Sequence, residues 1–466
     1  MSREGLIHAQ EKMVEAGIAP IAIDTFTRFY KLLEQHNSSY MREDEITPVE
    51  RVVWLKDVLG DHTTHEVDTA ALGKTAVVRL NGGLGTSMGL QSPKSLLPVR
   101  DGKTFLDIIA AQTLTARATH NVKLPLVFMN SQATDEQTCA ALEAYPNLAV
   151  PDVPLTMVQN YEPKLVADTL EPVEFPQSPE LEWCPPGHGD LYTVLQTSGV
   201  LESLSAQGIE YLFVANVDNL GAYPSPEIAS WFEQSGSSFV IEVAERTVAD
   251  RKGGHLVVKD GRLALREGAQ IAPEDAEAAG DISVHKYFNS NSLWIRVSAL
   301  QALLKEHNGV LPLPLIANAK TVDPADKTTE QVIQIECAMG AAIELFEDAQ
   351  ALVIDRSRFL PVKTTNNLLV LRSDIFDLDE TARLIARRAE PLVTLDPEWY
   401  AMMSDFDQRI GLHVPSLMNA ESLTVTGPWT FSSGVSVKGD AVLTHDSSVE
   451  ETVPERAVIT EAGIVR

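Results

Sequence analysis

The sequence predicts an α/β protein with a mainly parallel sheet and additional segments at both ends. Strand-like and helix-like segments alternate from about residue 75 to about residue 373, a pattern typical of parallel strands joined by crossover helices. At 466 residues the chain is too long for one compact core and indicates two or three domains. Its content of 44% hydrophobic and 22% charged residues is that of a soluble globular protein.

Charge, cysteine content and hydropathy restrict the partners and the compartment. The net charge of −28 argues against nucleic acid or an anionic membrane as a partner, so a polyanion site requires local basic residues and a metal. Cys139, Cys184 and Cys337 are odd in number and far apart, which indicates neither a disulfide framework nor a zinc cluster. The N-terminus lacks the apolar core of a signal peptide, and no run reaches the ~20 apolar residues of a membrane span. We therefore expect a cytoplasmic protein.

The first 70 residues predict a helical region to which we assign no chemistry. In the second of its three helical segments, Ile23, Phe26 and Leu33 fall near one face together with Phe29 or Tyr30, so we expect that face to pack on the main domain. The three predicted helices span residues 4–17, 22–36 and 49–60.

The alternating region then gives each element in turn. Thr104 and Asp107 are spaced as a capping box at the first helix, and Asp260-Gly261 is typical of a hairpin turn between two antiparallel strands. We expect strands at residues 76–80, 124–130, 154–160, 211–219, 237–246, 255–271 (a hairpin), 284–297 and 349–357, and helices at residues 105–117, 135–145, 191–204 and 329–346.

The segment from Thr75 to Arg100 carries the strongest chemical signal. An apolar strand stops at Asn81, and the glycines that follow allow positive φ and exposed N–H groups, which is the geometry that cradles phosphate. A proline-stiffened turn then holds Lys94, which would place a cation near a β- or γ-phosphate. The spacing matches neither G-x-G-x-x-G nor G-x-x-x-x-G-K-[ST]. An ordinary strand-to-helix turn with a solvated lysine fits these residues equally well. The glycines are Gly82, Gly83, Gly85 and Gly89.

The run LNGGLGTSMG followed by PKSLLPV resembles the signature of nucleotidyltransferases that make nucleotide sugars. In particular it is similar to the eukaryotic-type family of UTP:glucose-1-phosphate uridylyltransferases, also called UDP-glucose pyrophosphorylases. Asn81 and Leu84 fit this type, whereas the related N-acetylhexosamine enzymes carry A-G-G-x-x-T/S. The resemblance extends over about residues 75–440.

This resemblance implies a fold and a division into domains. The fold is a Rossmann-like mixed-sheet nucleotidyltransferase core of glycosyltransferase-A type, with an N-terminal helical extension and a C-terminal left-handed β-helix. We expect the helical region at residues 1–70, the catalytic domain at 71–380, and a linker with the β-helix at 381–466. Short alternating runs between residues 421 and 463 are spaced like the coils of such a helix. The family implies self-association through this module in some members, which the short tail here leaves open.

Several candidate nucleotide contacts follow the predicted strands, where loops of parallel sheets carry their chemistry. The amide of Gln159 can both donate to and accept from the edge of uracil, although a strand-end amide that satisfies local backbone is the more ordinary interpretation. The loop PPGHGD has a backbone fixed by proline and glycine, and the family implies base contact by Gly187 and nucleotide contact by His188. The resemblance extends these nucleotide contacts to Leu80, Gly82, Gly83, Met129 and Asn216.

A metal ligand and a second lysine complete the predicted reaction centre. Asp218 follows a buried strand, where a carboxylate can hold Mg²⁺ together with phosphate oxygens, or can simply form an Asx-turn. The segment RSRFLPVKTT is conspicuously basic in an acidic chain, and the family implies an essential lysine at Lys363 near the reacting phosphates. Lys94 and Lys363 are the predicted catalytic residues, while Arg356 and Arg358 are expected to support the loop.

The predicted sugar site lies in the antiparallel strands. Carboxylate and amide groups can pair the alternating donors and acceptors of a hexose, and residues two apart in a strand face the same side. The segment LREGAQ resembles the family pattern LxExAQ and keeps its glutamate at Glu267. The candidates are Gly254, Glu267, Phe288, Asn289 and Asn291.

The resemblance implies transfer of uridylyl from UTP to glucose 1-phosphate, giving UDP-glucose and pyrophosphate reversibly, with Mg²⁺ and direct in-line attack on the α-phosphate. Two alternatives stay open. A uridylyltransferase for galactose 1-phosphate or N-acetylglucosamine 1-phosphate would differ only around Asn289 and Asn291. A non-catalytic nucleotide-sugar sensor could lose Lys94, Lys363 or Asp218, and all three are present.

Overall fold

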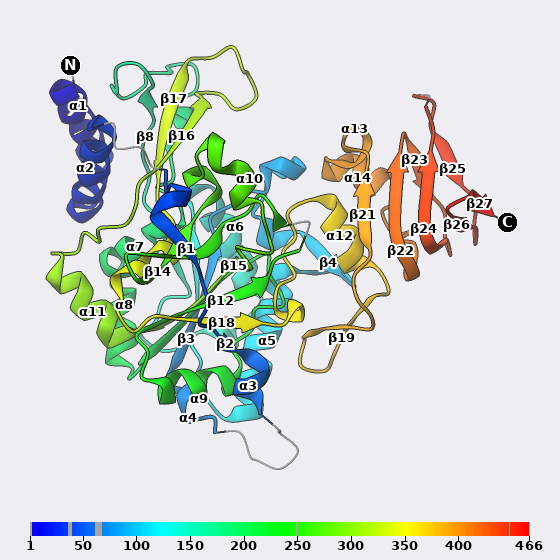
Figure 1. Ribbon diagram of the computed structural model, residues 1–466, viewed down its shortest axis with the longest axis horizontal. Helices are drawn as coiled ribbons and strands as arrows, with labels where there is room; N and C mark the ends of the chain where they lie inside the picture. Colours follow the sequence, from blue (N-terminus) through cyan, green and yellow to red (C-terminus); the bar gives the residue numbers. More distant parts are fainter. Residues whose placement is uncertain (1, 36–39, 61–67, 248–249, 447, 466) are drawn as a thin grey trace.

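A mixed sheet of eleven strands forms the centre of the molecule, a computed structural model that describes residues 2–35, 40–60, 68–247, 250–446 and 448–465 (Figure 1). The expected α/β fold is therefore confirmed, with a mixed rather than a purely parallel sheet. Along its main path the strand order is β2 (Val53–Trp54), β18 (Gln350–Ile354), β12 (Phe239–Glu245), β15 (Tyr287–Arg296), β11 (Tyr211–Asn216), β3 (Thr75–Asn81), β6 (Leu126–Asn130) and β7 (Thr156–Val158).

The direction of each strand determines which loops meet. Strands β11, β3, β6 and β7 run parallel, so the loops after them gather at one edge of the sheet. Strand β15 is antiparallel to both β11 and β12. Three further strands attach beside this path: β1 (Ile46–Pro48), β13 (His255–Lys259) and β14 (Arg262–Arg266), the last two forming the expected hairpin.

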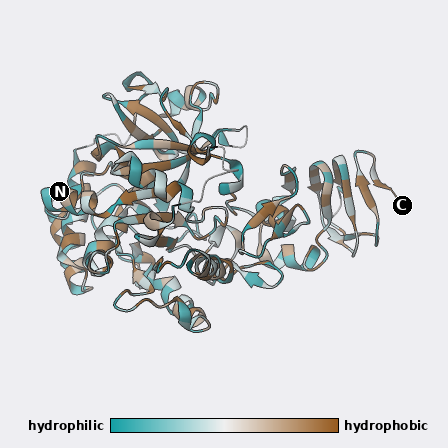
Figure 2. Cartoon of the chain, turned by 90° about the horizontal axis from the view of Figure 1, so that it is seen from below, coloured by the Kyte–Doolittle hydropathy of each residue, from teal (hydrophilic) through white to brown (hydrophobic). Residues whose placement is uncertain are grey.

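Apolar residues of the parallel strands point alternately to the two faces of the sheet, and each face has its own core. Val77 and Phe213 join one core, while Val78 and Val214 join the other. Helices α5 (Phe105–His120), α9 (Pro226–Ser235), α3 (Leu55–Leu59) and α4 (Ala70–Gly73) cover the first face. Helices α7 (Leu191–Thr197), α8 (Val200–Ala206) and α11 (Val297–Glu306) cover the second. Figure 2 shows the hydrophobic residues gathered on the inner strands.

The N-terminal segment is helical at its start, and its third predicted helix is wrong. Helices α1 (Ser2–Glu15) and α2 (Pro20–Glu34) pack on the second core through buried residues that include Phe26 and Phe29. Residue 36, the end of the second predicted helix, lies outside the described residues. In place of one helix over 49–60, the chain forms β2 and the five-residue α3, because Val53 pairs with Leu352 at the sheet edge.

The predicted helix over residues 329–346 is also wrong. Its first half is strand β17 (Gln331–Glu336), which pairs antiparallel with β16 (Ile316–Thr321), and its second half is a 3-10 helix, η10 (Met339–Leu345). Pairing with β16 establishes the strand here, because the buried residues Val332 and Ile335 are three positions apart and do not alternate. The predicted helix over 191–204 is interrupted at Gly199, whose φ of 74° separates α7 from α8.

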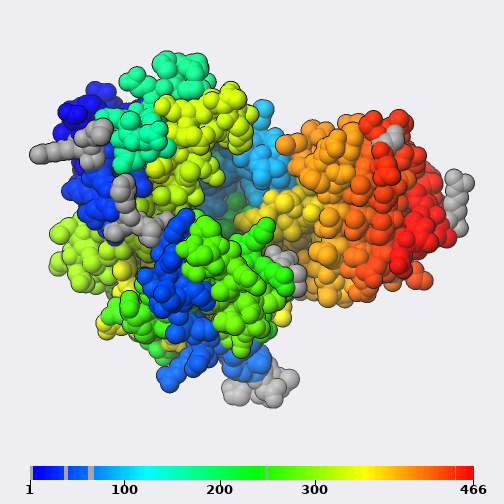
Figure 3. All heavy atoms as spheres, turned by 45° about the horizontal axis from the view of Figure 1, so that its top comes forward, coloured from blue at the N-terminus to red at the C-terminus, as the bar shows by residue number. Residues whose placement is uncertain are grey.

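The C-terminal region is a ladder of parallel strands that stands beside the main body (Figures 1 and 3). Parallel pairing joins β21 (Leu392–Leu395), β22 (Ser416–Thr426), β24 (Ser436–Thr444) and β26 (Val458–Thr460), and likewise β23 (Trp429–Phe431) with β25 (Glu451–Val453). Strand β27 (Gly463–Val465) closes the ladder antiparallel. Leu423 and Leu443 point into the first core, which therefore continues from the sheet into this ladder through α12 (Thr365–Arg372).

The remaining elements are short connections. They are α6 (Gln132–Leu142), α10 (Ala276–Ala279), α13 (Pro397–Tyr400), α14 (Met403–Arg409), β4 (Pro98–Arg100), β5 (Lys103–Thr104), β8 (Glu162–Pro163), β9 (Leu165–Val166), β10 (Trp183–Cys184), β19 (Phe376–Leu378) and β20 (Leu384–Ala386). The Thr104–Asp107 capping box forms at the start of α5 as expected. Among the described residues, no helix has the length and apolar character needed to cross a membrane.

Candidate active site

A pocket of about 370 Å³ opens where β3, β6 and β11 end. The structure brings together in its wall all the residues that the sequence assigned to the nucleotide, the two predicted catalytic lysines and three further residues. The predicted members are Leu80, Gly82, Gly83, Lys94, Met129, Gln159, Gly187, His188, Asn216, Asp218 and Lys363. The additional members are Gly85, Pro185 and Val217. None of the predicted sugar residues lines this pocket.

Two lysines converge on one buried carboxylate in this pocket. The Nζ of Lys94 lies 2.7 Å from Oδ2 of Asp218, and the Nζ of Lys363 lies 3.2 Å from the same oxygen. Burial alone would raise the pKa of Asp218, but Lys363 and Lys94 outweigh burial and hold that pKa below its ordinary value. The carboxylate is therefore ionised at neutral pH and can serve as a ligand or as a counter-charge.

The second oxygen of Asp218 fits a metal ligand. Within the part of the chain that the structure describes, the buried Oδ1 has no hydrogen-bond partner, which is costly for a carboxylate oxygen unless a ligand supplies one. No group of three or more His, Cys, Asp or Glu side chains in the described residues could hold a metal ion. A cation at Asp218 must then draw most of its ligands from elsewhere, as Mg²⁺ does when it binds one carboxylate and the phosphates of a substrate.

The end of the pocket that the sequence assigned to the base is closely packed around Gln159. The amide of Gln159 lies on Gly82, where an added Cβ would come within 2.9 Å of its Nε2. Gly187 has φ of 77°, and a Cβ there would lie 2.6 Å from the carbonyl oxygen of Cys337. Both glycines are thus required by close approach, and Gln159 contributes a polar side chain to this part of the pocket wall.

His188 has a fixed proton position. Its Nδ1 accepts the backbone N–H of Met339 at 3.0 Å, so the proton of the neutral ring resides on Nε2. Burial, with a smaller effect of the nearby Lys363, lowers the pKa of His188 to about 4. At neutral pH the ring is therefore an uncharged donor through Nε2 and no proton acceptor for catalysis.

A network that sequence reasoning missed holds the loop of Lys363 against the loop of Asp218. The side-chain amide of Asn219 donates to Arg358 O (3.2 Å) and accepts from Leu360 N (2.9 Å), and Val362 N donates to Asp218 O (3.2 Å). Beneath them, buried Arg79 of β3 donates to backbone carbonyls of residues 216, 219 and 222. The sequence signal for such a residue is a lone charge inside an apolar strand.

Arg358 is paired with Glu242 of β12, with Nη2 to Oε1 at 2.9 Å, and these side chains are 4% and 0% exposed. Truncation by Arg358→Ala leaves the buried Glu242 without its ion-pair partner, so we expect a loss of about 3–5 kcal/mol in the free energy of unfolding. Arg356→Ala is the matched control: Arg356 pairs with Asp250 but is 39% exposed, and its loss should cost about 1 kcal/mol or less. Thermal and urea unfolding of both variants would measure the difference, and equal losses would contradict the assignment. Both arginines support the loop, as expected.

The predicted sugar residues form a neighbouring group outside the pocket wall. Asn289 Nδ2 donates to Asn291 Oδ1 (2.9 Å) and to Glu267 Oε1 (3.4 Å), and Asn289 N donates to Gly254 O (3.0 Å). Burial raises the pKa of Glu267. The two asparagines meet through a bulge in β15, with φ of 56° at Asn291, rather than through a regular strand.

Phe288 and the start of η10 connect the sugar group to the pocket. The ring of Phe288 lies 5.5 Å from that of Phe359, in the loop that leads to Lys363. Gly340 lies against the amide of Asn289, and its neighbour Met339 donates to His188. The two groups of predicted residues therefore adjoin along residues 339–340.

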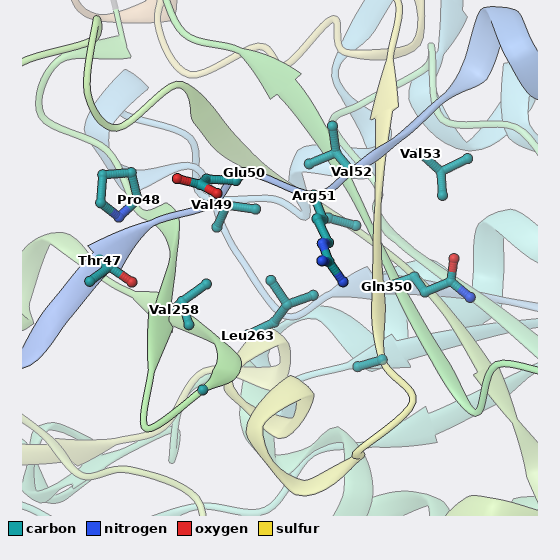
Figure 4. A pocket seen from close by; sticks show the side chains of 13 residues that line it. Thr47, Pro48, Val49, Glu50, Arg51, Val52, Val53, Val258, Leu263 and Gln350 are labelled. Carbon is teal, nitrogen blue, oxygen red and sulfur yellow. The ribbon is translucent and has the colours of Figure 1, made fainter.

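A separate cavity of about 730 Å³ lies at the edge of the sheet, away from these residues (Figure 4). Its wall is formed by the segment that crosses from β1 to β2, by the β13–β14 hairpin and by the start of β18. Most of the lining is apolar, and its polar members are Thr47, Glu50, Arg51 and Gln350. None of the predicted site residues lines it.

The mixed α/β sheet, the glycine loop and two lysines that meet at a carboxylate define a nucleotidyltransferase. A family model described as "UTP--glucose-1-phosphate uridylyltransferase" matches residues 23–438. The chain belongs to this family.

Individual relatives agree over nearly the whole chain. The UTP--glucose-1-phosphate uridylyltransferase of Solanum tuberosum is 37% identical over 425 residues, which are 90% of this chain and 87% of the relative. A UDP-glucose pyrophosphorylase mutant from Leishmania major, solved in complex with UDP-glucose, is 38% identical with a TM-score of 0.91, and the match covers 98% of both chains. A UDP-glucose phosphorylase from Trypanosoma brucei has a TM-score of 0.90 at 38% identity, covering 98% of this chain and 99% of the other.

Proposed function

We propose that this chain transfers the uridylyl group of UTP to glucose 1-phosphate, releasing pyrophosphate in a reversible reaction. The convergence of Lys94 and Lys363 on Asp218, beside the Gln159 pocket, is the observation that carries the proposal. This arrangement offers cations where a triphosphate must be neutralised and a polar edge where a base must be read. Family membership supplies the substrates.

The side chains of the pocket have separate tasks in this reaction. Backbone N–H groups around Gly82 and Gly83 hold phosphate oxygens, with Lys94 toward the β- and γ-phosphates that leave. Lys363 lies between the two reacting phosphates. A phosphate oxygen of the sugar phosphate attacks the α-phosphorus in line, its new P–O bond forms as the α–β bridging P–O bond breaks, and pyrophosphate takes the electron pair. No covalent enzyme intermediate is required.

The metal belongs to the proposal as Mg²⁺ held by Asp218. When bound, it supplies charge neutralisation to the phosphates of UTP. His188 adds a hydrogen bond from Nε2 to the nucleotide without a change in its own charge.

For the sugar, we propose that Glu267, Asn289 and Asn291 pair the hexose hydroxyls while Gly254 and Phe288 shape the wall. The mutual hydrogen bonds of Asn289, Asn291 and Glu267 pre-organise this group. The test is pyrophosphate release from UTP and Mg²⁺ with glucose 1-phosphate, galactose 1-phosphate and N-acetylglucosamine 1-phosphate in parallel. We expect release with glucose 1-phosphate. Equal release with all three would refute the sugar assignment, and release with none would refute the activity.

Gln159→Ala should erode the preference for UTP. The substitution removes the amide that both donates to and accepts from uracil, so UTP should lose roughly 10- to 100-fold in kcat/KM while CTP changes little. Turnover with UTP, CTP and ATP would measure the preference. An unchanged ratio of UTP to CTP would exclude Gln159 as the base reader.

Three further points are part of the proposal. The parallel C-terminal ladder is a left-handed β-helix in this proposal. The three domains span residues 1–70, 71–380 and 381–466. Self-association through this ladder is supported by two exposed apolar residues, Leu392 on the edge strand β21 and Val442 on the central strand β24. A cytoplasmic location is supported by the free thiols of Cys139, Cys184 and Cys337. Sedimentation and fractionation would test these points.

A further inference from the structure

Asp190 joins two loops of the base pocket through a single buried carboxylate. It accepts the backbone N–H of Asn160 at 2.6 Å and the side-chain Nδ2 of Asn160 at 2.8 Å to Oδ1 and 3.1 Å to Oδ2. Asn160 directly follows Gln159, and Asp190 closes the short 3-10 helix that begins at His188. Asp190 is 4% exposed, and it does not belong to the pocket wall.

The surroundings of Asp190 give it no opposite charge. Among the described residues, Glu162 of β8 and Cys337 at the end of β17 are the titratable groups that interact with Asp190. Arg28 acts on Cys337 and Lys164 acts on Cys184, but neither contributes to the pKa of Asp190. His188, on its own element, is neutral at pH 7. A carboxylate buried among such groups is costly, and Asn160 provides the hydrogen bonds that offset part of this cost.

The elements around it are otherwise fixed independently. Gly189 N donates to Cys337 O (2.8 Å) and Cys337 N donates to Pro186 O (3.0 Å), which anchors the PPGHGD loop to the end of β17. Gln159 N donates to Asn130 O (2.7 Å), which anchors the other loop to β6. The hydrogen bonds between Asp190 and Asn160 thus link two loops that are anchored separately. One loop carries Gln159, and the other carries Gly187 and His188.

We propose that Asp190 is a positioning residue for base recognition, which fixes Gln159 at the correct distance from Gly187 by binding Asn160 as an ionised carboxylate. This inference rests on the proposed function and adds to it a residue that touches no substrate. Its physical basis is that a base reader must be held in place before the ligand arrives, because loop ordering during binding costs affinity.

The proposal has a pH signature. Burial is the main cause that raises the pKa of Asp190 to about 6, against the lowering effect of the Asn160 hydrogen bonds. Above this pH the carboxylate accepts all three Asn160 contacts, whereas below it one oxygen becomes a hydroxyl, which is a weaker acceptor toward Asn160. Binding of a uridine ligand should therefore weaken as the pH falls below about 6, by up to about tenfold per pH unit. Uridine binding should be insensitive to pH above about 7.

UDP-glucose is the probe for this test, because its diphosphate diester does not titrate between pH 5 and 8. Calorimetric dissociation constants for UDP-glucose and CDP-glucose would be measured over this range on the full chain, with unfolding temperatures for each variant. The variants are Asp190→Asn, Asn160→Ala and their double mutant. Asp374→Asn is the matched control, since Asp374 also accepts one backbone N–H and one side-chain donor, from Leu417 and Ser416. Glu162→Gln tests the nearest other carboxyl group.

We expect Asp190→Asn to bind UDP-glucose roughly 10- to 100-fold more weakly at pH 7.5, to lose the pH dependence, and to lower discrimination against CDP-glucose. Asn160→Ala should weaken binding in the same direction, and the double mutant should be no weaker than Asp190→Asn alone, because both changes break one link. Asp374→Asn should behave as the unchanged protein. UDP-glucose binding by the unchanged protein tests the proposed function separately.

Three results would overturn the proposal. The first is unchanged affinity and base discrimination in Asp190→Asn. The second is a pH dependence that persists in Asp190→Asn or disappears in Glu162→Gln, which would place the titrating group elsewhere. The third is weaker binding in Asp190→Asn with base discrimination and pH dependence intact, which would reduce Asp190 to a purely structural group.

Discussion

Lys363→Ala should abolish turnover while UDP-glucose still binds. Lys363 is 59% exposed at the mouth of the pocket, whereas Lys94 is 12% exposed, so the loss of Lys363 leaves the rest of the site in place. Its charge is needed most where negative charge grows between the two reacting phosphates, so kcat should fall on the order of 10³-fold. The dissociation constant for UDP-glucose should change only a few-fold. Pyrophosphate release and calorimetry would measure the two quantities.

Two further variants make this expectation sharp. Lys363→Arg keeps the charge but changes its shape, and we expect it to recover only part of the rate. Lys320→Ala removes an exposed lysine of β16 outside the pocket and should leave turnover unchanged. If Lys363→Ala and Lys320→Ala have the same turnover, a catalytic role for Lys363 is excluded.

Asp218→Asn should have an effect of similar size, for a different reason. The amide keeps the shape of the carboxylate but cannot neutralise Lys94 and Lys363, and it is a poor ligand for Mg²⁺. We expect kcat to fall on the order of 10³-fold or more. Electron paramagnetic resonance of Mn²⁺ in the presence of UTP should show protein-bound metal in the unchanged chain and its loss in the variant.

The stability that Asp218→Asn loses should depend on pH, because folding lowers the pKa of Asp218. A carboxyl group whose pKa is lowered by folding stabilises the protein above its unfolded value and loses this contribution as the pH falls. Asp218→Asn should therefore lower the unfolding temperature at pH 7 more than at pH 3. Asp107→Asn, at the capping box of α5, is the control that should keep Mn²⁺ binding. Protein-bound Mn²⁺ in Asp218→Asn would contradict the metal assignment.

The pocket was predictable because its parts lie at the ends of strands. Gly82, Gln159 and Asp218 each follow an apolar run, and parallel pairing of such runs brings their ends to one edge. The residues that support them were not predictable in the same way. Arg79 and Glu242 could be noticed as charges within apolar strands, but their partners are carbonyl groups and an arginine far along the chain. No local pattern specifies such pairs.

The errors in secondary structure have a related cause. The apolar residues of 331–336 fit a helical spacing when the following residues are included, and this spacing predicts a helix. Pairing with β16 decides in favour of a strand, and that pairing is a tertiary fact. The sugar group shows the reverse case: Asn289 and Asn291 were grouped correctly, although a bulge and not strand alternation brings them together.

The distribution of the pocket along the chain has a consequence for biosynthesis. Asp218 is separated from Lys94 by 124 positions and from Lys363 by 145, so the three charges meet only after most of the polypeptide has been made. Closure of such long loops is slow, and it precedes any stabilising contact between the lysines and the carboxylate. Enzymatic activity should therefore be the last property to return during refolding, after helicity and compactness. Recovery of turnover, measured by stopped flow, would thus report complete folding of a nascent or refolded molecule. Circular dichroism would report only the first stages of folding.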